Sequence, residues 1–580
     1  MGSDEKPPST YRYNEKPTYT TSNGAPVENP QAWQRIGPQG PLLLQDFHLI
    51  DLLAHFDRER IPSVSCTPRA PVLTARFVEE SLFGEGFEVT HDISDISSID
   101  MLNQVGKKTK ALVRFSTVGG EKGSADSARD PRGFSVKFYT EEGNWDWVYN
   151  NTPIFFIRDP VKFPVLQPAY YVPSEPWINV FIHTQKRHPQ TNLKDATMVS
   201  LAANPSTDSL LTQPDVYIVL TPQSFDYWTK NQECIHQLMH LFSDRGTPYS
   251  YRHMNGYSGH THKWTKPDGS FVYVQVHLKT DQGNKTFTNE EAGKMASENP
   301  DWHTQDLFEA IERGEHPSWT VYVQTLTPEQ AEKFKWNVFD LTKVWPQSEV
   351  PLRPFGKLTL NKNPENYFAE IEQAAFSPSH LVPGVEPTAD PVLQSRLFSY
   401  PDTHRHRLGV NYQQIPVNTP LHAFNPFQRD GAMAVNGNYG ANPVRLVPTP
   451  NYASTFRPLT YKPVKAVNTP HEKWAGEVVT DLFGPVKPED YEQALGLWKV
   501  LGRQEGQQKN FIANVSGALA GAHPDVRART YEMFSRVTPE LGAAIMKETE
   551  KIAAYVETSR TMTGHDADCN RPTKDVRSKL

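Results

Sequence analysis

The chain has 580 residues, a formal net charge of -7 and three cysteines that lie far apart. This length allows one large core with an additional domain. The acidic balance provides no basic surface for nucleic acids or anionic membranes, so we expect neither as a partner. No apolar run approaches the roughly 20 residues that span a bilayer, and the N-terminal segment contains no apolar signal region. We therefore expect a soluble, unsecreted protein without a disulfide framework.

The first two thirds of the chain carry the signals of an antiparallel β-barrel. Residues 1–40 are polar and rich in Pro and Thr, so we expect an extended arm. Residues 41–362 are assigned to the barrel, because short β-branched and aromatic runs recur between Gly, Asn and Pro. The expected strands are ALVRFSTV, GFSVKFYT, DWVYNN, PIFFIRD, SWTVYVQTLT and the two arms of KWTKPDGSFVYVQVHLKT.

The last third combines an irregular segment with a helical domain. Residues 363–478 have little periodicity and many prolines, which predicts a long segment that wraps the barrel. Residues 479–557 carry apolar side chains at helical spacing, and Thr538 before Pro539 is typical of a helix start. Residues 558–580 form a polar tail. The predicted fold class is α+β, with an antiparallel β-barrel core, a wrapping segment and a C-terminal helical domain.

The most informative motif is RLFSYPDTHRHRLG, from Arg396 to Gly409. A phenolate is an anionic oxygen donor that can bind ferric iron, but a free tyrosine titrates at about pH 10. If this segment is helical, Arg396 lies one turn before Tyr400, and its guanidinium can hydrogen-bond the phenolate and favour it. An isolated Arg-x-x-x-Tyr pattern is more often an ordinary surface tyrosine beside a basic loop, so the motif needs support from the rest of the chain.

That support is a resemblance to a known family. The whole motif resembles the haem-ligating signature of monofunctional haem catalases, in which tyrosine is the proximal ligand. Residues 111–160, LFSDRGTPYSYRHMNGYSGHT, VHLKTDQG and NPENYFAEIEQAAF also resemble catalase sequence, in the same order, across most of residues 88–418. The resemblance implies the catalase fold, haem b as cofactor and the disproportionation of hydrogen peroxide to water and dioxygen. It also implies a homotetramer.

Carried over residue by residue, the resemblance implies a complete proximal side. Tyr400 is the expected axial ligand of the iron, and Arg396 is its expected partner. Arg114 and Arg407 are the expected partners of the haem propionates, since guanidinium groups match carboxylates in a fork-like geometry. His404, in the same motif, is assigned to the cofactor-binding set.

The distal side departs from the family pattern. The resemblance implies that Phe163 packs on the haem, that Asn150 orients the peroxide and that Ser116 supports the distal base. The base itself belongs to a Glu-Arg-x-x-His-Ala-x-Gly motif that is expected between RERIP and FEVTHD. Residues 63–86, which lie between these flanks, contain no histidine. Because a base must move a proton between the peroxide oxygens, we expect haem binding with severely impaired oxygen evolution.

Three segments have no counterpart in the family pattern, namely residues 63–86, 165–180 and 199–223 (the atypical segments). Two of them carry Val-Ser near the start, which is how a GT-AG-T splice donor reads in frame. The last one ends at Gln223, which a CAG acceptor encodes. We hypothesise that all three are translated introns, from a faulty gene model or from retained splicing. The alternative is genuine loop insertion, which surface loops tolerate.

NADPH and cellular location are two further expectations. Some members of the family bind NADPH, and residues that match this site are His236, Ser243, Arg245, Asn255 and Lys279. His240 stands where an aromatic residue is usual, and Gln347 where a histidine is usual, so NADPH binding stays open. The last three residues, Ser578-Lys579-Leu580, form the address that the peroxisomal import receptor reads. We therefore expect a peroxisomal protein.

Three hypotheses about function remain. The first, which we favour, is a genuine catalase whose sequence is corrupted by the atypical segments. The second is a tyrosinate-ligated haem protein, or a peroxidase, whose catalase activity is impaired by the missing histidine. The third is a product that does not fold. Haem occupancy separates the third from the others, and oxygen release from peroxide separates the first from the second.

Overall fold

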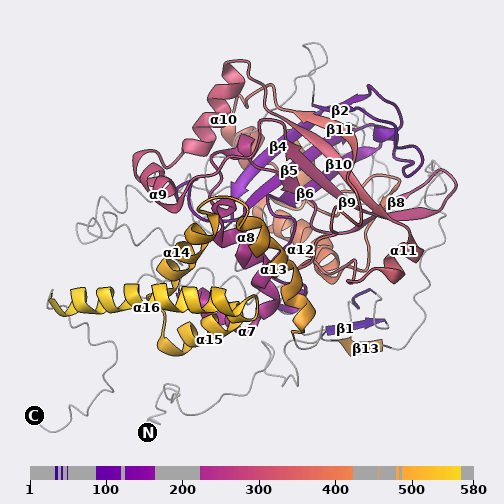
Figure 1. The fold of residues 1–580 in the computed structure, drawn as a ribbon. Coiled ribbons are helices and arrows are strands. Elements are labelled where there is room, and N and C mark those ends of the chain that lie inside the picture. Colours follow the sequence, from indigo (N-terminus) through magenta and orange to yellow (C-terminus); the bar gives the residue numbers. More distant parts are fainter. Residues whose placement is uncertain are drawn as a thin grey trace, which may run out of the picture.

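An antiparallel sheet, bent into a nearly closed barrel, is the centre of the fold (Figure 1). The computed structural model describes residues 33–36, 41–43, 49, 86–118, 124–162, 222–421, 455, 478–481 and 486–562. The strands follow the order β3-β2-β11-β10-β9-β7-β6-β5-β4, while β8 pairs with β9 and β12. Their bounds are β2 (Phe87–Val89), β3 (Lys108–Thr109), β4 (Ala111–Thr117), β5 (Arg132–Thr140), β6 (Gly143–Asn150), β7 (Gly256–Tyr257), β8 (His262–Thr265), β9 (Phe271–Thr280), β10 (Ser318–Leu326), β11 (Arg353–Thr359) and β12 (Val385–Glu386).

Alternation along β4, β5 and β6 separates the barrel interior from a second buried face. Phe115 pairs with Phe134 across the first two of these strands, and both pack with Trp319 in the interior. Trp319, Val321 and Val323 all lie in this interior cluster, as the period-2 pattern of β10 requires. The intervening residues of β4 to β6 face the other way, and they include Arg114, whose side chain is also buried. The predicted barrel is therefore confirmed. The outer face of β4 to β6 carries polar side chains that are buried.

The prediction of a strand at PIFFIRD is wrong. Residues 153–159 form bends and no strand, although Ile154, Phe156 and Ile157 are buried. Phe156 and Ile157 pack in the same cluster as the C-terminal helices. A short apolar run at the edge of a sheet reads the same in sequence whether it joins the sheet or packs on helices.

The expected wrapping segment contains a long helix that periodicity did not indicate. Helix α12 (Pro391–Leu408) has 18 residues and begins after Asp390, whose carboxylate accepts hydrogen bonds from the backbone N–H groups of Val392 and Leu393. Pro391 occupies the first helical position, where its missing N–H costs nothing. Buried side chains occur around most of this helix, so no single apolar stripe marks it.

Helices gather at one end of the barrel, where α13 to α16 (gold and yellow in Figure 1) lie against α7 and α8. Their bounds are α7 (Pro222–Lys230), α8 (Ile235–Phe242), α13 (Glu492–Leu501), α14 (Gln507–Leu519), α15 (Pro524–Ser535) and α16 (Pro539–Met562). The predicted start of α16 is confirmed, because the Thr538 hydroxyl accepts from the Leu541 N–H at 3.1 Å. In the described part of the chain, no helix has both the length and the apolarity of a bilayer-spanning segment.

The expected arm is paired with the start of the expected helical domain. The described part of the expected arm, β1 (Trp33–Ile36), pairs antiparallel with β13 (Val478–Asp481) at the start of the expected helical domain. Three further helices lie in the connections between barrel strands. They are α9 (Asn289–Glu298) and α10 (Trp302–Glu312), between β9 and β10, and α11 (Pro328–Lys333), between β10 and β11.

A buried group of charges joins the barrel to the C-terminal helices. Arg158 lies 2.8 Å from both Asp340 and Asp490, and Lys343 lies 2.6 Å from Asp490. Burial by itself would raise the pKa of Asp490, but Lys343 and Arg158 outweigh it and lower the pKa to about 2. The carboxylate is therefore ionised in the folded protein at neutral pH.

Replacing Asp490 by asparagine is expected to lower the free energy of unfolding by about 3–5 kcal/mol, because Lys343 loses its buried counter-ion. The folded-state pKa lies below the unfolded value of about 3.9, so this stabilisation is present above that value and is lost as the pH falls towards 2. Urea unfolding at a series of pH values measures the difference. The control is Asp525→Asn on the exposed face of α15, and an equal loss in both variants would contradict the prediction.

Candidate active site

Helix α12 brings the expected ligand and its expected partner together. Arg396 Nη2 donates to Tyr400 Oη at 3.1 Å, and the guanidinium carbon lies 4.8 Å from the centre of the Tyr400 ring. The same nitrogen donates to the Val148 carbonyl at 3.0 Å, which ties the helix to strand β6. The segment is helical, as the motif requires, so the one-turn spacing of Arg396 and Tyr400 has the predicted geometry.

His260 and Asp390 form a buried hydrogen-bonded pair at the start of α12, which the sequence did not predict. His260 Nδ1 lies 2.6 Å from Asp390 Oδ2, and the same carboxylate caps α12 through its other oxygen. Burial lowers the pKa of His260, although Asp390 acts in the opposite direction. Only the helix-start pattern Asp-Pro before the motif signalled Asp390, and His260 lies 130 residues away in the sequence.

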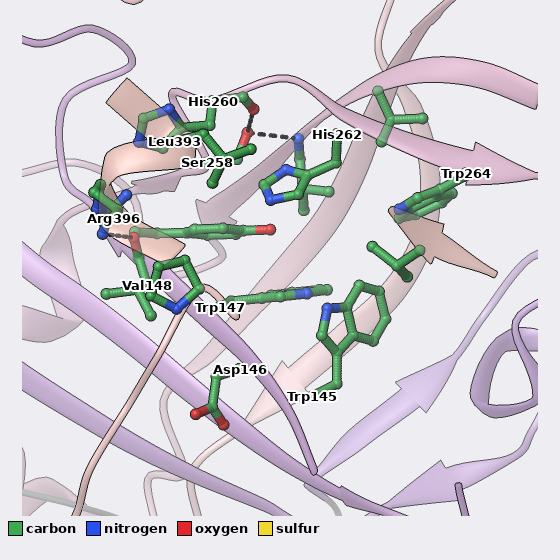
Figure 2. A pocket seen from close by; sticks show the side chains of 15 residues that line it. Trp145, Asp146, Trp147, Val148, Ser258, His260, His262, Trp264, Leu393 and Arg396 are labelled. Carbon is green, nitrogen blue, oxygen red and sulfur yellow. Dashed lines mark hydrogen bonds between the residues drawn. The ribbon is translucent and has the colours of Figure 1, made fainter. Parts of the chain in front are cut away.

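A small cavity lies on the barrel side of Arg396. Figure 2 shows Arg396 and Leu393 of α12 on one side and Trp145 and Trp264 on the other, with His262 between them. Its volume of about 20 Å³ is enough for a water molecule and far too small for a porphyrin. This cavity therefore lies among the residues that pack against Arg396, and it is not the site that would hold the cofactor.

Replacing Asp390 by serine is expected to lower the free energy of unfolding by about 1–3 kcal/mol, because His260 loses its buried acceptor. Helix α12 should keep its start, since serine is also a favoured N-cap. Asp390→Asn is the matched variant, because its amide can cap the helix and still bond the other tautomer of His260. Urea unfolding followed by circular dichroism compares the two, and equal losses would show that the His260 contact contributes nothing.

The two expected propionate partners converge on one carbonyl group. Arg114 Nη1 donates to the Ala374 oxygen at 2.8 Å, and Arg407 Nη2 donates to it at 3.1 Å. Arg114 comes from β4 and Arg407 from the last turn of α12, so the sheet and the helix place two cations side by side. Two guanidinium groups at one point suit two carboxylates of a single ligand.

His404 is placed beside these cations. Its Nε2 lies 2.8 Å from the Phe376 carbonyl and therefore carries the proton, because a carbonyl oxygen only accepts. Its Nδ1 lies 3.4 Å from Arg407 Nη2. Burial lowers the pKa of His404 well below its usual value, and Arg407 adds to the effect. The structure thus assigns His404 contacts with the protein, and its expected contact with the cofactor stays a prediction.

Two of the expected distal residues lie in one row of the sheet. Gly133 of β5 pairs with Ser116 of β4 on one side and with Asn150 of β6 on the other. Directly paired residues point to the same face, which is also the face of Arg114, two residues from Ser116. A Cβ atom on Gly133 would lie 2.6 Å from Ser116 Oγ, so any larger residue would force the Ser116 side chain to move.

The other distal expectations lie outside the described residues. Phe163 and residues 165–180 belong to this group, as do all of residues 63–86 except Gly86. Of residues 199–223, only residues 222 and 223, at the start of α7, are described.

The residues that are described fit a haem group. Tyr400 offers a phenolic oxygen that already accepts from a cation, and the face of β4 to β6 beside it carries Arg114, Ser116 and Asn150. Tyr400 also packs in the cluster of Leu112, Val148 and Phe376, which supplies apolar cover. An anionic oxygen ligand, converging cations and an apolar wall are the chemistry that an iron porphyrin with two carboxylates requires.

Comparisons with known proteins agree with this donor set. Residues 20–456 match the model of the Catalase family, and residues 485–549 match that of the Catalase-related immune-responsive family. The peroxisomal catalase of Candida albicans is 52% identical over 539 residues, which cover 93% of this chain and 99% of that protein. Peroxisomal catalase A of Saccharomyces cerevisiae is 52% identical over 535 residues, which cover 92% and 93%.

Solved structures give the same result. The structure of catalase A from Saccharomyces cerevisiae aligns with a TM-score of 0.71 at 48% identity, covering 92% of this chain and 99% of that one. A bacterial catalase aligns with a TM-score of 0.67 at 34% identity, covering 93% and 97%. Because these matches span most of the chain and agree with the proximal motif, the chain belongs to the catalase family, whose members disproportionate hydrogen peroxide to water and dioxygen.

Proposed function

We propose that this catalase acts at a haem b whose iron is bound by the Tyr400 phenolate. The observation that carries the proposal is the hydrogen bond from Arg396 to Tyr400 Oη, because a cation at this atom favours the anionic form that binds ferric iron. When bound, the haem iron supplies the redox chemistry that splits the peroxide oxygen–oxygen bond. The relatives named above are catalases, and the comparisons favour none of the alternative functions.

The chain's own residues would bind and orient the reactants. Arg114 and Arg407 would hold the propionates near Ala374, and Arg396 would hydrogen-bond the Tyr400 oxygen that binds the iron. Asn150 would donate to a peroxide oxygen, and Ser116, in the same row beside Gly133, would support a distal base. The proton transfer between those oxygens has no histidine assigned to it, because residues 63–86 contain none.

Haem content tests this proposal most directly. The full chain, purified with haem supplied during expression, should contain about one haem for each chain and show a ferric tyrosinate spectrum. A soluble, folded protein that binds no haem would overturn the proposal. Oxygen release from hydrogen peroxide then measures how much catalase activity the bound haem supports.

We propose that NADPH binds with a phosphate group in the cavity beside Arg245. This cavity, of about 50 Å³, is also lined by His240, His253 and Asn255. Burial lowers the pKa of Lys279, and neighbouring Arg245 lowers it further. In the described residues, no carboxylate lies within ion-pair distance of either cation, and a phosphate group would relieve their repulsion. Gln347, which stands where a histidine is usual in the family, accepts from Lys279 Nζ at 3.5 Å.

Replacing Lys279 by glutamate is expected to weaken NADPH binding by about 10- to 100-fold, because a charged hydrogen bond of about 1.5–3 kcal/mol turns into a repulsion. Titration of NADPH fluorescence with the full chain measures the dissociation constant. Lys294→Glu, on the exposed face of α9, is the control with the same change of charge. Equal affinities in both variants would contradict the proposed site.

We also propose a peroxisomal homotetramer. Several relatives are named peroxisomal catalases, and the chain carries Ser578-Lys579-Leu580 as the sequence that the import receptor would bind. Hydrogen peroxide is the small-molecule partner. The domain bounds expected from the sequence, at residues 40, 362, 478 and 557, stay proposals, and the pairing of β1 with β13 ties the first of these domains to the fourth.

A further inference from the structure

A buried ion pair with no contact to Tyr400 lies on the outer face of the barrel sheet. Lys137 of β5 and Asp146 of β6 are cross-strand partners, and Lys137 Nζ lies 2.8 Å from each carboxylate oxygen. Both side chains are completely buried. The pair lies in the same sheet face as Arg114 and Val148, one row further along.

The Asp146 carboxylate also holds a loop. Its Oδ2 accepts from the Ser377 N–H at 3.0 Å and lies 2.7 Å from His380 Nδ1, while the Asp146 N–H donates to the His380 carbonyl at 3.0 Å. Burial by itself would raise the pKa of Asp146, but Lys137 and His380 outweigh it, so the net direction is downward. An ionised carboxylate therefore fixes residues 377–380 to strand β6.

The loop held by Asp146 is the one on which the cofactor-facing arginines converge. Residues 371–376, directly before Ser377, accept from Arg114 and Arg407 at Ala374 and from His404 at Phe376. Two cations face the Phe376 ring, with Lys137 Nζ at 5.2 Å and Arg114 Cζ at 4.8 Å from its centre. The loop is thus clamped at one end by the ion pair and at the other by the arginines.

Stability alone gives a poor account of this pair. Taking two charges out of water costs several kcal/mol each, and buried ion pairs are often replaced by apolar residues with no loss of stability. Orientation is a different matter, because an apolar pair could not accept from Ser377 and His380. A carboxylate at this place therefore specifies where the loop lies.

We propose that Asp146, paired with Lys137, is a positioning residue that orients residues 371–377 and thereby sets how tightly Arg114 and Arg407 hold the cofactor. This inference rests on the proposed haem site. His380 extends the anchor, because its Nε2 lies 3.3 Å from the hydroxyl of Tyr412, whose ring packs 5.4 Å from that of His404. Asp146 is thus connected to helix α12 in two ways. One runs through residues 371–376 to Arg407 and His404, and the other runs through His380 and Tyr412 to His404.

The experiment compares the apolar replacement of two ion pairs in the haem-loaded full chain. One variant is Lys137→Met with Asp146→Leu. The control is Arg252→Met with Asp306→Leu, which removes a partly buried pair between residues 251–253 and α10, away from residues 371–380. The rate of haem transfer to excess apomyoglobin, the ferric spectrum and the thermal midpoint are measured for both.

The first variant should lose haem about 10- to 100-fold faster than the unsubstituted chain, the range found for outer-shell partners of metal sites, with an altered ferric spectrum. The control should keep both the rate and the spectrum. An unchanged rate in the first variant, or an equal increase in both, would overturn the proposal. His380→Leu keeps the ion pair and should give a smaller increase of the same kind.

Tyr400→Phe, measured in parallel, separates this inference from the proposed function. If that variant loses the tyrosinate spectrum while the Lys137 and Asp146 variant retains haem, only the positioning role is wrong. If Tyr400→Phe leaves the spectrum unchanged, the proposed ligand is wrong and the positioning role falls with it.

Discussion

Replacing Tyr400 by phenylalanine is expected to abolish the ferric tyrosinate spectrum and at least most of the haem content. Phenylalanine has the same ring and fills the same space in the cluster of Leu112 and Phe376, so the fold should persist. It has no oxygen to bind iron, and it leaves Arg396 beside an apolar ring. The expected effect is larger than for any other single substitution, because the change removes the only axial ligand that the motif supplies.

Tyr139→Phe is the matched control for this experiment. Tyr139 is also partly buried against the same cluster, but its hydroxyl donates to the Val417 carbonyl at 2.6 Å. The visible spectrum and haem content of both variants are measured at equal protein concentration. A Tyr400→Phe protein with an unchanged spectrum would remove the chemical basis of the assignment.

The rate of oxygen evolution by this chain is expected to be about 10²- to 10⁴-fold lower than that of a catalase with a distal histidine. The reason is the proton that must pass from one peroxide oxygen to the other, for which residues 63–86 offer no histidine. Asn150, the residue expected to orient peroxide, keeps its place in the sheet beside Gly133, so peroxide should still be oriented. The purified protein should therefore show strong haem absorbance with little oxygen release.

The matched variant replaces residues 63–86 by a segment that carries Glu-Arg-x-x-His-Ala-x-Gly. This chimera should recover oxygen release without a change in haem content, as measured with an oxygen electrode. Ordinary catalase turnover by the original chain would refute the prediction. Transcript sequencing across residues 62–87 addresses the cause, and a dominant mRNA that contains all three atypical segments would end the intron hypothesis.

Local sequence patterns predicted several barrel strands and the start of the last helix. The barrel strands of residues 111–117, 132–140 and 271–280 were expected, because their apolar periodicity and turn residues are short-range signals. The start of α16 at Thr538 and Pro539 was expected for the same reason. PIFFIRD failed because its burial comes from helices far along the chain, and α12 was missed as a helix because it is buried on several sides.

The sequence by itself determined the family and the pairing of Arg396 with Tyr400, because a one-turn spacing is set by the helix alone. Only the tertiary structure decided that Arg114 and Arg407 meet at Ala374, that Ser116 and Asn150 flank Gly133, and that His260 reaches Asp390. These contacts join residues far apart in sequence. They depend on strand register and on the packing of α12 against the sheet, which no local pattern encodes.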